Sequence, residues 1–179
     1  MATCLWGVGI VLYLVLVVII VLRLMVVEVT PGEMGPAYWI TMGATAISVR
    51  AAAGLLTLPG STGGFPMAEL HPFVLGASVV LWSFGSWWIP LLVLFGLWRH
   101  LLRHFPVTYE PRLWSMVFPL GMYTVASYTL GRAGRFSFMV TIAKVWVWVG
   151  VVAWAGVLAL MGVALLRALA RTGLPARHT

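Results

Sequence analysis

Five stretches of this sequence are long and apolar enough to form membrane-spanning helices, and this feature limits the possible folds more than any other. A helix needs about 20 residues to cross a hydrocarbon layer roughly 30 Å thick. Charged residues are only 8% of the chain, against roughly 25% in soluble domains. We therefore expect an all-α transmembrane fold, a single domain over residues 1–179. The predicted helices cover residues 5–27, 36–58, 72–98, 112–131 and 138–167.

Proline, glycine and charged residues mark the limits of these helices. The first helix is followed by Glu28 and a Thr-Pro-Gly turn. Pro36 then stands at the start of the second helix, where a missing backbone N–H costs little. The stretch 59–66, PGSTGGFP, predicts an exposed loop, after which Pro72 opens the third helix. The first apolar run lacks the basic residues that precede a signal-peptide core, so we interpret it as a span.

The basic residues are distributed unequally between the two ends of the predicted helices. The connections on one side, with the C-terminal tail, carry seven of them, and those on the other side carry two. Since cytoplasmic loops are richer in Lys and Arg, we expect a cytoplasmic C-terminus, an outer N-terminus and a multi-pass protein of the plasma (inner) membrane. The first group is Arg23, Arg99, Arg103, Arg112, Arg167, Arg171 and Arg177, and the second is Arg132 and Arg135.

A short motif recurs at the start of two predicted helices. Pro36-Ala-Tyr-Trp39 opens the second helix, and Pro111-Arg-Leu-Trp114 opens the fourth, 75 residues further along. Because this offset covers two helices, the repeating unit is a helical hairpin. Internal repeats of this kind allow equivalent helices to pack around a common axis, as they do in many transporters.

The second and fourth helices are richer in small and hydroxylated residues than the first and fifth. Gly43, Thr45 and Ser48 lie on the second helix and Gly121 lies on the fourth, whereas Val, Leu and Ile dominate the first and fifth. One interpretation is that the second and fourth helices line a transport path. The other is that small residues only permit close packing in a bundle without a pore.

Residues 114–127, WSMVFPLGMYTVAS, and residues 87–94, WWIPLLVL, resemble the tellurite-resistance/dicarboxylate transporter family, which is related to the slow anion channels of plants. Segments 6–13 and 38–48 are similar to it as well, so the resemblance covers most of the chain. It implies half of a ten-helix fold of helical hairpins, with the helices here matching helices six to ten. Because half of that fold cannot enclose a pore, we expect an oligomer or completion by an N-terminal half.

The resemblance also places Phe118 at the position of the family's gating phenylalanine. An aromatic ring across a narrow path is a hydrophobic constriction that blocks ions until the ring rotates. Pro119, directly after it, lacks a backbone N–H and is expected to kink the fourth helix. The alternative interpretation is a lipid-facing phenylalanine beside an ordinary kink.

Two cations lie inside the predicted spans. Arg50 is deep in the second helix, where a charge costs at least about 2.5–3.5 kcal/mol unless it faces a cavity or a partner. It either raises the local anion concentration in a path or extends its long side chain to the outer interface. For Lys144, close to the outer end of the fifth helix, we favour the second arrangement.

Other classes of function find no support in the sequence. It has no nucleotide-binding loop, catalytic triad or paired carboxylates, so we do not expect an enzyme. The histidines and Cys4 lack metal-ligand spacing, and we expect neither a metal nor a cofactor. The net charge of +7 comes mostly from arginines at the ends of apolar runs, so we do not expect a nucleic-acid partner.

Together these features predict membrane transport of a small anion, such as a C4-dicarboxylate (malate), tellurite or sulfite, without dependence on voltage. The expected partners are this anion and the lipid bilayer, besides the second half of the fold. The alternative is a non-transporting membrane fragment or an accessory subunit that packs against a partner. The candidate pore and gate residues are Phe118, Pro119, Gly121, Gly43, Thr45, Ser48 and Arg50.

Overall fold

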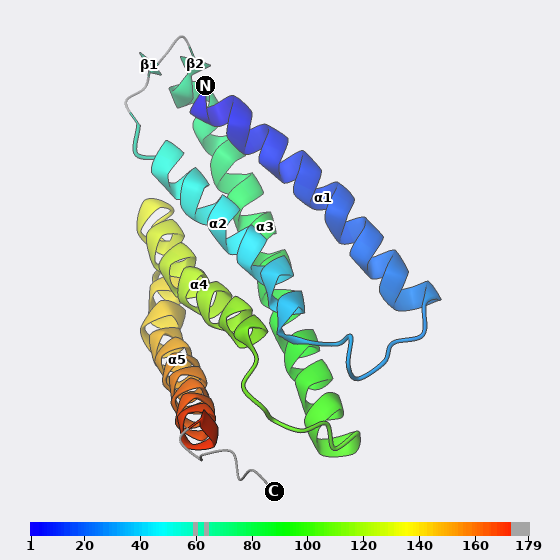
Figure 1. The fold of residues 1–179 in the computed structure, drawn as a ribbon. Coiled ribbons are helices and arrows are strands. Elements are labelled where there is room, and N and C mark those ends of the chain that lie inside the picture. Colours follow the sequence, from blue (N-terminus) through cyan, green and yellow to red (C-terminus); the bar gives the residue numbers. More distant parts are fainter. Residues whose placement is uncertain (59–60, 63–64, 173–179) are drawn as a thin grey trace, which may run out of the picture.

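The structure, a computed structural model, describes residues 1–58, 61–62 and 65–172 and contains five long helices in these ranges (Figure 1). The expected all-α membrane fold is therefore confirmed. The long helices are α1 (Ala2–Val26), α2 (Trp39–Leu55), α3 (Met67–Leu97), α4 (Trp114–Ala133) and α5 (Ser137–Thr172). Two 3-10 turns, η1 (Pro36–Tyr38) and η3 (Pro111–Leu113), a π-helical turn, η2 (Trp98–Leu102), and a two-residue pair of strands, β1 (Ser61–Thr62) and β2 (Phe65–Pro66), complete the described chain.

The largest differences from the predicted limits are at α3. It begins at Met67, so that Pro72 lies inside the helix instead of opening it. Proline is tolerated there because it removes a single hydrogen bond close to a helix end, where water can reach the freed carbonyl. The stretch predicted as a plain loop includes β1 and β2, which pair antiparallel with Ser61 opposite Pro66. Residues 59–60 and 63–64 of that stretch lie outside the described residues.

The two copies of the repeated motif adopt the same local structure. In each, a residue in extended conformation, Gly35 or Glu110, precedes a 3-10 turn that starts at the proline. The turn is closed by the amide of Tyr38, which donates to the Gly35 carbonyl at 3.2 Å, and by the amide of Leu113, which donates to the Glu110 carbonyl at 2.9 Å. The tryptophan then becomes the first residue of α2 or α4. The α2–α3 and α4–α5 hairpins thus begin alike, as the repeat predicts.

The helices run back and forth between two ends of the molecule (Figure 1). α1, α3 and α5 run toward the lower end of Figure 1, and α2 and α4 run away from it; of these helices, α3 and α5 reach closest to the bottom. The N-terminus, β1 and β2 lie at the opposite end. Among the long helices, α2 and α4 are central, because α1 and α3 pack on α2 while α5 packs on α4.

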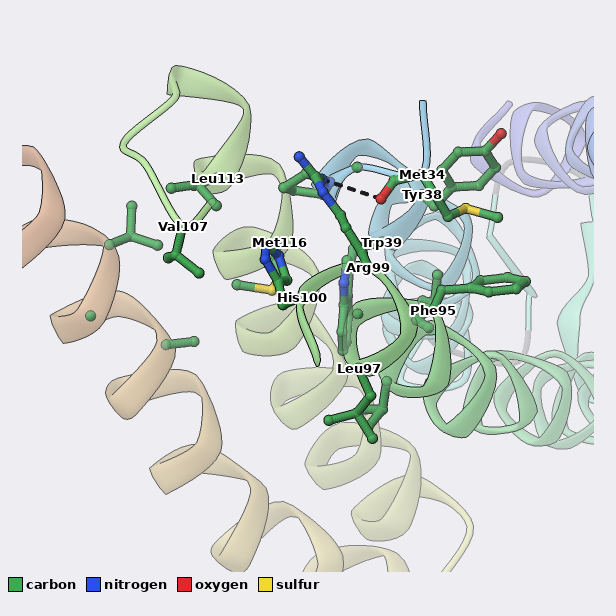
Figure 2. Close-up of a pocket in the computed structure, with 18 of the residues that line it drawn as sticks. Met34, Tyr38, Trp39, Phe95, Leu97, Arg99, His100, Val107, Leu113 and Met116 are labelled. Carbon is green, nitrogen blue, oxygen red and sulfur yellow. Dashed lines mark hydrogen bonds between the residues drawn. The ribbon is translucent and has the colours of Figure 1, made fainter. Parts of the chain in front are cut away.

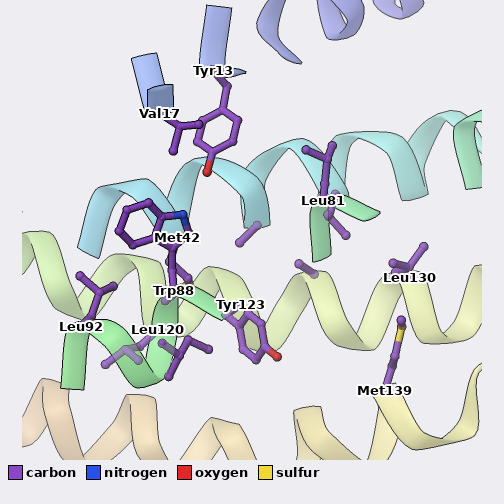
Figure 3. Close-up of a cluster of buried hydrophobic side chains, with 14 residues drawn as sticks. Tyr13, Val17, Met42, Leu81, Trp88, Leu92, Leu120, Tyr123, Leu130 and Met139 are labelled. Atoms are coloured by element: carbon purple, nitrogen blue, oxygen red, sulfur yellow. The ribbon is translucent and has the colours of Figure 1, made fainter. Parts of the chain in front are cut away.

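The main cluster of buried side chains lies where the two hairpins meet (Figure 3). Met42 of α2, Trp88 of α3 and Leu130 of α4 are each inaccessible to solvent. From α1, only Tyr13 and Val17 join this cluster. α1 is therefore held on one face only, where Trp6 is also buried and Ile10, Ile20, Val21 and Leu24 are partly buried, and most of its remaining side chains are exposed.

Three of the helices are long and apolar enough to cross a membrane by length and composition: α1, α3 with its π-helical extension, and α5. The other two, α2 with 17 residues and α4 with 20, do not reach this standard among the described residues. The most apolar helices thus flank the two less apolar ones. This is the arrangement expected when the first group contacts lipid and the second does not.

Candidate functional site

α2 and α4 touch through a glycine. A Cβ added at Gly43 would lie 2.9 Å from Cγ of Pro119 and 3.1 Å from its Cβ, closer than a side chain tolerates. Pro119 is itself buried, and its ring is rigid. The close approach of the two helices therefore depends on the missing side chain at position 43.

One face of α4 is bound to α3. The indole N–H of Trp82 donates to the hydroxyl of Ser127 at 2.8 Å, and the hydroxyls of Ser86 and Tyr123 lie 2.8 Å apart. The opposite face of α4 is exposed. Its residues recur every three or four positions, which is the spacing of one helical face. It consists of Phe118, Gly121, Val125, Tyr128 and Arg132.

α2 is divided in the same way. A Cβ at Gly85 of α3 would overlap the hydroxyl of Thr45, so this side of α2 is in close contact with α3. The exposed residues, Ile40, Ile47, Arg50 and Ala51, lie on the other side of α2. Because both exposed faces are turned away from α3, they form one surface over the central helix pair. We call these α2 residues, together with the five exposed residues of α4, the front face.

The structure separates the predicted pore residues into two groups. Phe118, Gly121 and Arg50 are exposed on the front face, with Phe118 at 57% exposure. Gly43 and Pro119 lie between α2 and α4, and Thr45 lies between α2 and α3. Their different environments mean that the seven residues do not form one cluster.

The hydroxyls among the predicted residues are occupied by the backbone of their own helix. Thr45 donates to the carbonyl of Met42 at 2.6 Å, and Ser48 donates to the carbonyl of Ala44 at 2.9 Å. The carbonyl of Ser48 also accepts from the indole N–H of Trp6 at 3.0 Å, which joins α1 to α2. Both hydroxyls are therefore used within α2, and only the carbonyl of Ser48 joins two helices.

Arg50 extends along α2 toward the C-terminal end of that helix. One of its terminal nitrogens lies 3.5 Å from where a Cβ of Gly54 would be. A cation there interacts favourably with the partial negative charge of a helix C-terminus. Arg50 forms no ion pair with any described residue.

A groove separates α1 from α2 beside the front face. Its volume is about 350 Å³, and its lining includes Val17 and Ile20 of α1 and Ile40 and Ala44 of α2. Arg23, which pairs with Glu33 at 3.3 Å, lies at one end of the groove. The groove and the front face together form a largely apolar surface that no described part of this chain covers.

The sequence placed Arg99 among the basic residues of the helix ends, but the structure buries it (Figure 2). Only 5% of Arg99 is exposed, and it donates to the carbonyl of Met34 at 3.2 Å. Its guanidinium carbon lies 4.2 Å from the ring centre of Phe105. The burial of Arg99 could not be recognised from the sequence. Arg99 and the exposed Arg103 each lie between an apolar residue and a histidine, so their sequence neighbours do not distinguish them. Among the described residues, no group of His, Cys, Asp or Glu could hold a metal ion.

The fold and the front face define an all-helical membrane protein with a central helix pair that is less apolar than its surroundings. Residues 1–162 match the model of the SLAC1 family, whose description is voltage-dependent anion channel. The chain belongs to this family, which agrees with the resemblance stated above. The family is one of membrane transport proteins. Its description names voltage dependence, whereas the sequence predicts transport without dependence on voltage.

Relatives of two different lengths match the chain. An uncharacterized membrane protein of Mycobacterium tuberculosis is 40% identical over 163 residues, which are 90% of this chain and 81% of the relative. Two uncharacterized transporters of Methanocaldococcus jannaschii are 28% and 27% identical over 74% and 69% of this chain, but over only 36% and 34% of their own lengths. The archaeal relatives are thus much longer than the segment they share with this chain. No solved structure matches the chain.

Proposed function

We propose that this chain contributes the α2–α4 wall of a path for small anions, and that another polypeptide closes the path. The observation that supports this proposal is the position of the two least apolar long helices, whose front face is left open by α1, α3 and α5. The front face is largely apolar but carries Arg50 and Arg132, and arginines within a span are disfavoured against acyl chains and favoured against water or protein. The closing polypeptide is a second copy or an N-terminal half, and it covers the groove between α1 and α2 as well.

The charge of the front face favours anions. Arg50 and Arg132 are its only charged residues, and neither forms an ion pair with a described residue. In a narrow path with low-dielectric walls, unpaired cations raise the local concentration of anions. The glutamates of the chain lie in the connections or, for Glu69, in the first turn of α3, away from this face.

Phe118 is the proposed gate of the path. It is the fifth residue of α4, next to the rigid contact between Pro119 and Gly43. Its ring is 57% exposed and has room to rotate, whereas the residue that follows it is fixed. A bulky apolar ring on a fixed support is suited to close a narrow aqueous path and to open it by a rotamer change.

The proposal is tested by anion flux. The purified chain is reconstituted into liposomes, and efflux of chloride, sulfite and malate is measured separately. Phe118→Ala is expected to raise the flux of the conducted anion several-fold, because the constriction is removed. The panel of anions also decides between dicarboxylate and inorganic substrates.

Phe73→Ala is the matched control, because Phe73 is 67% exposed on α3 and lies outside the front face. It should conduct like the unmodified protein. Equal flux for both variants would remove Phe118 as the gate. A complete lack of flux through a homogeneous reconstituted preparation would exclude closure of the path by a second copy, and would leave completion by an N-terminal half or an accessory role.

A further inference from the structure

A cavity among the described residues lies on the other side of the helix pair from the front face. Its volume is about 650 Å³, within the range of roughly 300–1,000 Å³ that is usual for small-molecule sites. α3 and α5 form its long walls, and η1 and the start of α4 close its inner side. Its lining is largely apolar, with Arg99, His100 and Tyr38 as the charged or titratable residues (Figure 2).

Arg99 lacks a compensating charge in this cavity. Only 5% of its surface is exposed, and no described carboxylate forms an ion pair with it. Its Nε–H is buried and has no hydrogen-bond partner. A buried cation without a counter-charge is costly, so the site favours an anion. The planar guanidinium binds oxyanions such as phosphate through two parallel hydrogen bonds.

His100, the neighbour of Arg99 in the cavity lining, is neutral or positive and so cannot balance the charge of Arg99. Its Nδ1 lies 2.9 Å from the carbonyl oxygen of Phe105, so that this nitrogen is already engaged. Other basic residues lie in the same connection: Arg103 directly follows η2, and Arg112 lies in η3, where it pairs with Glu110 at 2.6 Å. Of these arginines, Arg99 is the one that lines the cavity.

The apolar part of the cavity has the shape for a hydrocarbon chain. Its wall on α5 extends from Ala153 to Leu160, about 10 Å at 1.5 Å per residue. Gly96 and Gly156 line it, and a Cβ at either glycine would meet no atom within 4 Å. The space beside these glycines is thus empty within the chain. α3 and α5 are both apolar enough to span a membrane, so the cavity lies between two lipid-facing helices.

We propose that this cavity binds an anionic phospholipid. The lipid phosphate is held by Arg99 at the level of the arginine-rich helix ends, and one acyl chain lies between α3 and α5 beside Gly96 and Gly156. Basic pockets between membrane helices are suited to anionic headgroups, because the charge is satisfied at the interface while the chains remain in the apolar layer. The bound lipid fills the gap between the α2–α3 and α4–α5 hairpins.

The test compares three probes on the purified, delipidated full chain: dioleoylphosphatidylglycerol, dioleoylphosphatidylcholine and inorganic phosphate. Binding is measured by native mass spectrometry and by the rise in Tm. We expect the anionic lipid to bind at least about tenfold more tightly than the zwitterionic lipid with the same chains. Arg99→Gln should remove this preference, whereas Arg103→Gln should keep it. Equal binding of the two lipids, or equal losses in both variants, would overturn the proposal.

A second pair of variants leaves Arg99 intact and tests the acyl-chain part. Gly156→Leu places a side chain in the empty space and should weaken binding of the anionic lipid about tenfold or more. Gly162→Leu is the control, because Gly162 lies on the same helix outside the cavity and also has no atom within 4 Å of its Cβ position. Unchanged binding in Gly156→Leu would contradict the proposal even if Arg99→Gln does not fold. Stabilisation by inorganic phosphate equal to that by the anionic lipid would identify a free-oxyanion site instead.

Discussion

At the scale of single residues, the glycines of this chain differ in what they permit. Gly43 allows α2 and α4 to touch, because even a methyl group there would meet the ring of Pro119. Gly76 of α3 has no atom within 4 Å of its Cβ position and needs no such contact. Gly43 therefore serves close packing, one of the two interpretations open from the sequence, whereas Gly121 of α4 is exposed on the front face.

Gly43→Ala is expected to lower the free energy of unfolding by about 1–3 kcal/mol, because the added methyl group forces α2 away from the rigid ring of Pro119. Gly76→Ala introduces the same methyl group into a helix without a contact, and its stability should be unchanged or slightly higher. Denaturant titration of both variants in one detergent measures the difference. A Gly43→Ala variant as stable as Gly76→Ala would show that the two helices can separate freely.

At the scale of helices, α1 differs from the others because it has no hairpin partner in this chain. It packs mainly on α2, with the Tyr13 ring also edge-on against Phe84 of α3, and only Trp6, Tyr13 and Val17 are buried along its length. The hydrogen bond from Trp6 to the Ser48 carbonyl is a polar link between the two helices, at 3.0 Å. The open side of α1, next to the groove, is where a further helix would pack.

Trp6→Phe keeps an aromatic ring but removes this hydrogen bond, so α1 should detach more often. If the free energy that holds α1 on α2 falls by about 1 kcal/mol, hydrogen exchange of the α1 amides should be roughly fivefold faster. Mass spectrometry of the protein in lipid nanodiscs measures this exchange. Trp154→Phe serves as the control, because Trp154 is 49% exposed on α5. Exchange that rises equally in both variants, or in neither, would rule out a specific link at Trp6.

Much of the element structure could be predicted because it depends on local patterns. Long apolar runs locate the helices, and each Pro-x-x-Trp motif fixes the same 3-10 start. The burial of Arg99 could not be predicted, since it depends on the π-helical turn at the end of α3 meeting the loop at Met34. The division of the candidate pore residues also depends on tertiary contacts, because Phe118 and Pro119 are adjacent in sequence but face opposite environments.

At the scale of the whole molecule, the two ends carry different numbers of arginines. Those near the ends of α1, α3 and α5 or the start of α4 are Arg23, Arg99, Arg103, Arg112, Arg167 and Arg171, and those in the second half of α2 or near the end of α4 are Arg50, Arg132 and Arg135. The orientation with the first group in the cytoplasm remains a prediction from the positive-inside rule. It also fixes the leaflet in which the proposed lipid site lies.

Reporter fusions test this orientation. Green fluorescent protein fused after Thr179 should fluoresce, and alkaline phosphatase fused there should be inactive, because the former folds in the cytoplasm and the latter outside it. The same reporters placed before Met1 should give the opposite pair of results. Fluorescence from both fusions, or from the N-terminal fusion alone, would require the reverse arrangement or another number of spans.

The central claim is that the front face meets water and not acyl chains. It is tested most directly by thiol labelling of two single-cysteine variants in intact membranes, in a Cys4→Ser background that removes the only native thiol. Val125→Cys lies on the front face, where Val125 is 43% exposed, and Val152→Cys lies on the outer surface of α5, where Val152 is 70% exposed. A charged, membrane-impermeant methanethiosulfonate reagent modifies only a thiol that water reaches. The account predicts rapid modification at position 125 and none at position 152, and equal protection of both thiols would contradict it.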